Sequence, residues 1–140
     1  PQVRFSEENQ VSEQMAEAFA TPVIVPSNIR DGSLRSATNN LSIPVIVYEA
    51  GEALRFDEFA IKLGLRGILR VMAYLGMLPP SQVKHVAKKK FQPAIAKSTF
   101  WIRALASGMM IDAKPLGYKI NKGGILCSII DPLGDNKVNI

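Results

Sequence analysis

The apolar residues in the first half of the chain alternate between helical and strand-like spacing. Over residues 8–20 they recur at intervals of four, three and one, which predicts an amphipathic helix. The hydroxyl and acidic residues at 6–8 suit the start of such a helix. The runs at 22–25 and 43–48 are short, continuous and rich in β-branched residues, which is typical of strands buried on both faces.

The segments around these two strands complete a regular α/β pattern. A turn at 31–33 and a short helix over 34–39 separate the strands. A long apolar helix then begins at 56–57, with Asp57 as its candidate N-cap, and continues to residue 78. The order helix, strand, helix, strand, helix predicts an α/β unit with a mostly parallel sheet.

The pattern changes at Pro79 and Pro80, which stop a helix and begin a stretch without apolar periodicity. We therefore expect an α/β domain over 1–78, a linker over 79–96 and a β domain over 97–140. Short strand-like runs in the last segment, separated by glycine and Asp-Pro turns, predict a small antiparallel sandwich or half-barrel. These runs are residues 99–102, 108–111, 119–120 and 125–130.

Composition excludes several classes of protein. The 140 residues are 47% hydrophobic and 21% charged, with a net charge of +5, which fits neither a disordered tail nor a polybasic arm. Residues 1–78 hold seven basic and nine acidic side chains, and the rest hold ten basic and three acidic, so the excess of positive charge lies after the prolines. The stretch 56–78 is the only one apolar enough for a membrane span. Three cations interrupt it, so we expect no membrane association.

The single cysteine, the single histidine and the lysine run indicate neither a disulfide, a metal site nor a nucleic-acid interface. The single thiol, Cys127, cannot build a disulfide framework and lies in an apolar run, so we expect a buried thiol in a cytoplasmic protein. His85, the only imidazole, lacks the further ligands that a metal needs. The lysine run at 88–90 is typical of a solvated surface, and no nucleic-acid-binding module is visible.

The strongest candidate for chemistry is Glu49, which follows a buried strand and precedes Ala50 and Gly51. Open α/β sheets place their sites at the carboxyl ends of strands, where a glutamate can act as a general base. A structural role is the alternative, in which Glu49 caps the next helix or pairs with Arg30, Arg35 or Arg55. Glu52 is expected to be a solvated loop residue or a charge at a helix start.

A set of ordered motifs resembles the succinylglutamate desuccinylase/aspartoacylase family. The resemblance covers nearly the whole chain and includes residues 30–35 (RDGSLR), 44–51 (PVIVYEAG), 101–104 (WIRA) and 117–134. It implies the second half of a carboxypeptidase-like α/β domain followed by a small all-β, half-barrel domain. It also implies part of a zinc-dependent hydrolase that removes the acyl group from an N-acyl amino acid.

The resemblance assigns roles to two residues of this sequence. Glu49 corresponds to the family's general base in its Glu-x-Gly motif, and Arg35 resembles the arginine that contacts a substrate carboxylate. The family's zinc ligands, a His-x-x-Glu pair and a distant His, precede the matched region. We therefore expect no metal ligand in this chain, zinc only in a longer parent protein, and a catalytically inactive C-terminal fragment. Exposed edges of an incomplete sheet would then favour homo-oligomers.

A biotinyl or lipoyl carrier, or another interaction module, is the alternative function. The glycine and lysine spacing over 117–126 resembles such half-barrels. A carrier needs a lysine at a tight hairpin tip, commonly beside Met or Asp, and Met109 and Met110 have no lysine next to them. A structural role for the β segment is therefore preferred.

Overall fold

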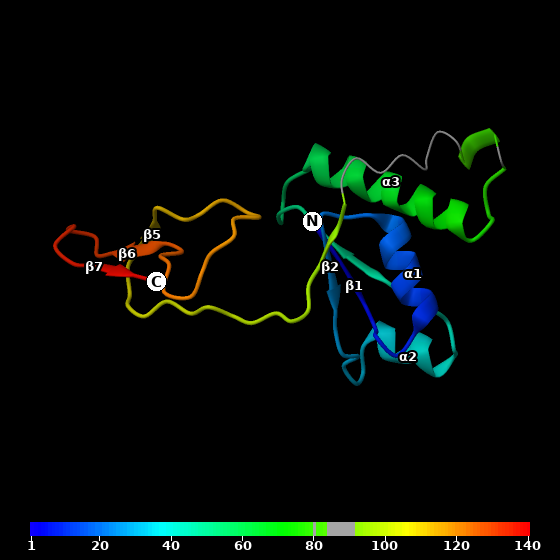
Figure 1. Ribbon diagram of the computed structural model, residues 1–140, viewed down its shortest axis with the longest axis horizontal. Helices are drawn as coiled ribbons and strands as arrows, with labels where there is room; N and C mark the ends of the chain where they lie inside the picture. Colours follow the sequence, from blue (N-terminus) through cyan, green and yellow to red (C-terminus); the bar gives the residue numbers. More distant parts are fainter. Residues whose placement is uncertain (80, 84–91) are drawn as a thin grey trace. The chain divides into compact units, whose positions relative to one another are not determined.

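The computed structural model describes residues 1–79, 81–83 and 92–140. The chain divides into two compact units, Pro1–Thr99 and Phe100–Ile140 (Figure 1). All the described helices belong to the first unit, and the second is built from strands and turns. The first unit is thus mixed α/β, and the described part of the second is all β.

The first unit contains a four-stranded sheet with the strand order β3-β1-β2-β4. These strands are Gln2–Phe5 (β1), Val23–Pro26 (β2), Val47–Glu49 (β3) and Ala94–Ile95 (β4). β2 is parallel to β1 and to β4, whereas β3 is antiparallel to β1. Two of the three strand pairs are parallel, so the sheet is mostly parallel, with β3 as an antiparallel edge strand. Strand β4 lies within the segment expected to be a linker.

The expected helices are all present. They are α1 (Gln10–Phe19), α2 (Leu34–Asn40) and α3 (Glu58–Tyr74). The side chain of Asn9 caps α1 by accepting from Ser12 N at 2.9 Å. Asp57 caps α3, as predicted, because its Oδ1 accepts from Phe59 N at 2.9 Å and from Ala60 N at 3.1 Å.

The core of the first unit lies between one face of the sheet and the helices α1 and α3. Its buried members are Val3, Phe5, Ala16, Phe19 and Ile24. Helix α3 approaches this core closely at two glycines. A Cβ added to Gly67 would lie 2.2 Å from the Phe19 ring, and one added to Gly64 would lie 2.8 Å from the Tyr48 ring.

The strand predicted over 43–48 is shorter than expected, and helix α3 is more exposed than its apolar sequence suggests. The run 43–48 forms a strand only at its end, because Pro44 has no N–H to donate and Val45 N donates instead to Ser12 Oγ at 3.0 Å. Helix α3 buries one face only, and Phe59, Ile61, Leu65 and Ile68 on it are exposed.

The cations of α3 differ in their surroundings. Lys62 pairs with Glu58 at 3.0 Å, but Arg70 is buried and donates to the carbonyl of Phe19 at 3.2 Å. None of the helices in the described ranges is long and apolar enough to cross a membrane.

The second unit contains the three-stranded antiparallel sheet β5-β6-β7, formed by Met109–Ile111, Ser128–Ile130 and Lys137–Asn139. The strand-like runs at 108–111 and 125–130 are confirmed in part. The strands predicted at 99–102 and 119–120 are wrong, because neither run forms a strand in the described chain. Trp101, in the first of these runs, is 87% exposed. Cys127 is buried, as expected.

A single carboxylate organises the turn between β6 and β7. Asp131 Oδ1 accepts from the backbone N–H groups of Leu133, Gly134 and Asp135, and Oδ2 accepts from Asn136 N and Nδ2. The side chain of Asn136 is the largest cause of a lowered pKa for Asp131, and the backbone donors add to it.

We expect acid to open this turn. Because the folded-state pKa of Asp131 is lowered, its contribution is present above the unfolded-state value of about 3.9 and is lost as the pH falls through the folded value. NMR of the 131–136 amides between pH 7 and pH 2 measures this change. Asp131→Asn should loosen the turn already at pH 7, whereas Asp135→Asn should leave it intact. A wild-type turn that is unchanged at pH 2 would contradict the prediction.

Candidate functional site

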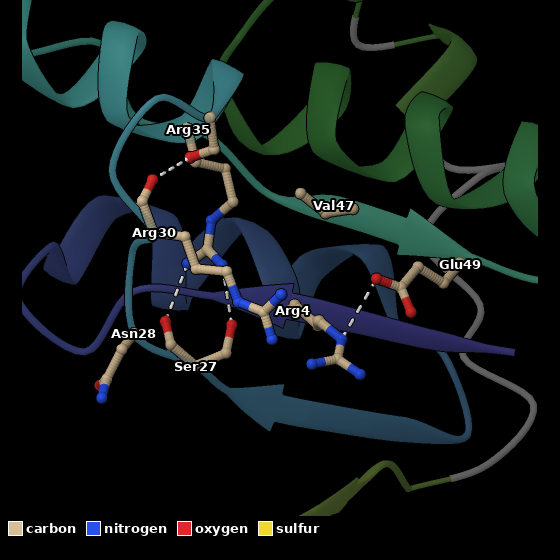
Figure 2. Close-up of a pocket in the computed structure, with 8 residues that line it drawn as sticks. Arg4, Ser27, Asn28, Arg30, Arg35, Val47 and Glu49 are labelled. Carbon is tan, nitrogen blue, oxygen red and sulfur yellow. Dashed lines mark hydrogen bonds and ion pairs between the residues drawn. The ribbon is translucent and has the colours of Figure 1, made fainter.

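An arginine-rich pocket of about 580 Å³ lies in the first unit, beside β1, β3 and α2 (Figure 2). Three guanidinium groups and one carboxylate line it, together with small polar residues. Its lining residues are Arg4, Ser27, Asn28, Arg30, Ser33, Arg35, Val47 and Glu49. The pocket thus brings together the two residues singled out from the sequence, Glu49 and Arg35.

The register of β1 and β3 places two of these charges on one face of the sheet. Gln2 lies opposite Glu49, and Arg4 lies opposite Val47. Residues two apart on a strand share a face, so all four side chains point to the side away from the core residues of β1. The burial of β1 alternates accordingly.

The antiparallel direction of β3 changes where Glu49 lies. Glu49 ends its strand, but its partner Gln2 is at the start of β1, so Glu49 is at the opposite edge from the carboxyl ends of β1 and β2. The expectation that Glu49 lies at the carboxyl edge of a parallel sheet is therefore wrong. The pocket instead extends from Glu49 to Ser27 and Asn28, which follow β2.

Both carboxylate oxygens of Glu49 have partners. Oε1 lies 3.2 Å from Arg4 Nε, and Oε2 accepts from Gln2 Nε2 at 2.8 Å. The ion pair is not aligned as a hydrogen bond, since Arg4 Nε is a buried donor with no hydrogen-bond partner in the described structure. Glu49 therefore does pair with an arginine, but the partner is Arg4 rather than Arg30, Arg35 or Arg55.

Helix α2 positions Arg35. Ser33 caps this helix, accepting from Ser36 N at 3.1 Å and donating to the carbonyl of Arg30 at 2.6 Å. The guanidinium of Arg35 then reaches the end of β2, where Nη1 donates to Ser27 Oγ at 2.8 Å and Nη2 donates to Ser27 O at 2.9 Å. Figure 2 shows this fork closing on Ser27.

Burial and a neighbouring positive charge both lower the pKa of Arg35. Burial is the main cause of its lowered pKa, and the nearby charge of Arg4 is the second cause. Arg35 Nε is also buried without a hydrogen-bond partner in the part of the chain described. A bound anion would satisfy such donors and reduce the repulsion between the two guanidiniums.

Sequence reasoning missed Arg4 and Ser27. The alternation of polar Gln2 and Arg4 with apolar Val3 and Phe5 is a strand signal, but it is only four residues long and sits at the start of the chain. Ser27 follows β2 and gives no signal of its own, because its role depends on the approach of α2.

The other candidates do not join the pocket. Glu52 is exposed and pairs with Arg55 at 3.4 Å, in keeping with a solvated loop residue. His85 and the lysines at 88–90 lie outside the described residues. Within the described ranges, no three His, Cys, Asp or Glu side chains are grouped to hold a metal ion, so these residues do not fit a zinc site.

The fold of this chain is similar to that of a succinylglutamate desuccinylase/aspartoacylase and of an ectoine utilization protein. The resemblance read from the motifs is thus confirmed at the level of the fold. By sequence, the chain matches no family model and no curated protein.

Two solved structures carry this assignment. One is succinylglutamate desuccinylase/aspartoacylase from Rhodobacter sphaeroides, with a TM-score of 0.70 and 17% identity over 99% of this chain. The other is the ectoine utilization protein EutE (DoeB) from Ruegeria pomeroyi, with a TM-score of 0.72 and 14% identity over 98% of this chain. The chain spans 43% and 45% of these proteins, respectively.

Proposed function

We propose that the arginine-rich pocket is the carboxylate-binding part of a hydrolase that removes the acyl group from an N-acyl amino acid. The observation that carries the proposal is the placement of Arg35, Arg4 and Glu49 around one cavity in a deacylase-like fold. Planar guanidinium groups bind carboxylates through paired hydrogen bonds, and N-acyl amino acids carry at least one carboxylate.

In this proposal Arg35 is the main substrate ligand. Its two Nη atoms are fixed on Ser27, which holds the guanidinium plane in place and leaves the second hydrogens of the Nη atoms for a ligand. Arg30 is exposed at the pocket and adds positive charge where a ligand enters. Donors that are already fixed lose little conformational entropy when a carboxylate binds, so the affinity is higher.

Glu49 is the proposed proton acceptor. Its side chain is 48% exposed and lines the same cavity, so a bound substrate and its attacking water can reach it. Geometry is the first requirement for a general base, and the position of Glu49 on the side of the cavity opposite Ser27 supports this role (Figure 2).

We further propose that the metal ligands of the enzyme lie outside this chain, so that the chain alone is inactive. The lack of fit between the described residues and a zinc site supports this, as does the coverage of less than half of the two structural neighbours. The purified chain is expected to retain substoichiometric zinc after desalting and not to turn over N-acetylaspartate. Turnover by the 140-residue chain would contradict this part of the proposal.

Binding can be tested separately from turnover. Titration of the ¹⁵N-labelled chain with N-acetylaspartate or succinate should shift amides at 27–35 and 47–49, and raised salt should weaken the binding because the contacts are ionic. Binding without effect on these amides, or no binding at low salt, would contradict a carboxylate site in this pocket.

A further inference from the structure

Each carboxylate oxygen of Glu49 already contacts a donor of the protein, and such contacts make a general base a weaker proton acceptor. Oε1 faces Arg4 Nε at 3.2 Å and Oε2 holds the amide of Gln2 at 2.8 Å. While these contacts persist, a water beside Glu49 competes with two donors for the carboxylate. Loosening either contact would therefore make Glu49 a better proton acceptor.

Arg4 is the contact that a ligand can change. It lies within the cavity, between Glu49 on the same face of the sheet and Arg35, whose pKa it helps to lower. Its side chain is 36% exposed, and its pairing with Glu49 lacks hydrogen-bond alignment. A part-exposed, poorly aligned ion pair exchanges readily for a better one.

The charge balance of the pocket also favours the binding of a ligand carboxylate at Arg4 in place of Glu49. Three arginines and one glutamate line it, so Glu49 alone leaves an excess of positive charge. The buried Nε–H groups of Arg4 and Arg35 both lack a hydrogen-bond partner among the described residues. One ligand carboxylate between these two guanidiniums would satisfy donors that Glu49 leaves unsatisfied.

We propose that a carboxylate ligand displaces Glu49 from Arg4, so that ligand binding itself frees the general base. Arg4 is then a positioning residue that holds Glu49 in the empty pocket and the ligand in the occupied one. This inference rests on the proposed carboxylate-binding function of the pocket. It adds a competition between the ligand and a side chain of the protein for one guanidinium.

The competition is measurable with succinate as the probe. Glu49→Gln should bind succinate about three- to tenfold more tightly than wild type, because the competing carboxylate is gone. In wild type, the ¹³C signal of the Glu49 carboxylate and the Nε–Hε signal of Arg4 should move together during the titration. Glu52→Gln removes an exposed carboxylate paired with Arg55 and should leave the affinity unchanged.

A double-mutant cycle separates competition for Arg4 from general repulsion between Glu49 and the ligand. In an Arg4→Gln background, Glu49→Gln should have little effect on succinate affinity, since the shared partner is absent. Arg4→Met, which removes the charge and all side-chain donors but keeps an unbranched chain, gives a second background if Arg4→Gln does not fold.

The outcomes distinguish this inference from the proposed function. If succinate binds the pocket but Glu49→Gln binds it no more tightly, or gains equally with and without Arg4, the exchange is overturned and the carboxylate site stands. If succinate does not bind at the pocket at all, the proposed function fails and the exchange fails with it.

Discussion

Ile24→Ala is expected to destabilise the first unit by about 2–5 kcal/mol, the range for removing a large aliphatic side chain from a well-packed core. Ile24 is 1% exposed and packs with Val3, Phe5, Ala16 and Phe19 between the sheet and the helices. The loss has two parts, which are the transfer free energy of the removed methyl groups and the cavity that remains.

Urea unfolding followed by circular dichroism at 222 nm measures this loss, because all the described helices belong to the first unit. Val23→Ala is the matched control. Val23 is the preceding residue of β2, faces the other side of the sheet and is 37% exposed, so its replacement should cost less than about 1 kcal/mol. Equal losses at the two positions would mean that Ile24 does not face the core, as after a one-residue slip in the register of β2, which exchanges the buried and exposed faces of the strand.

The helices of the first unit could be predicted because their signals are local. Asp57 before the apolar period of α3, and Ser33 before α2, cap their helices through their own side chains. Such contacts depend on residues two or three apart and survive any change in the rest of the fold.

The direction of β3 could not be predicted because it depends on a distant pairing. The sequence shows an apolar run before Glu49, but its antiparallel pairing joins residues 47–49 to residues 2–4, which lie far away in the sequence. Likewise, exposed Trp101 lies in a run rich in β-forming residues that gains no strand partner in the described chain. Strand propensity favours an extended chain without specifying what it pairs with.

The candidate site was predictable only in part for the same reason. Glu49 and Arg35 stand out in motifs, whereas Arg4 belongs to the pocket through strand register and Ser27 through the docking of α2. These two missed residues are the partners that determine how the two predicted ones are held.

Arg35→Gln is expected to weaken succinate binding tenfold or more, equivalent to at least about 1.4 kcal/mol. The change removes one of the pocket's three positive charges and the fork that donates to Ser27 Oγ and Ser27 O. Hydrogen bonds from a charged donor contribute about 1.5–3 kcal/mol each, so the anchoring of α2 to the end of β2 should weaken as well. Titration by NMR gives the affinity, and amide exchange over 27–36 reports the anchoring.

Two further variants separate the charge of Arg35 from its position. Arg35→Lys keeps the charge but has no planar fork, so it should recover only part of the affinity. Ser27→Ala removes the hydroxyl acceptor and leaves the carbonyl, so it should loosen Arg35 with a smaller loss of binding. Arg55→Gln changes an exposed arginine that pairs with Glu52, and it should match wild type. If Arg35→Lys binds succinate as tightly as wild type, the pocket recognises charge alone, and the geometry of the fork at Ser27 has no part in binding.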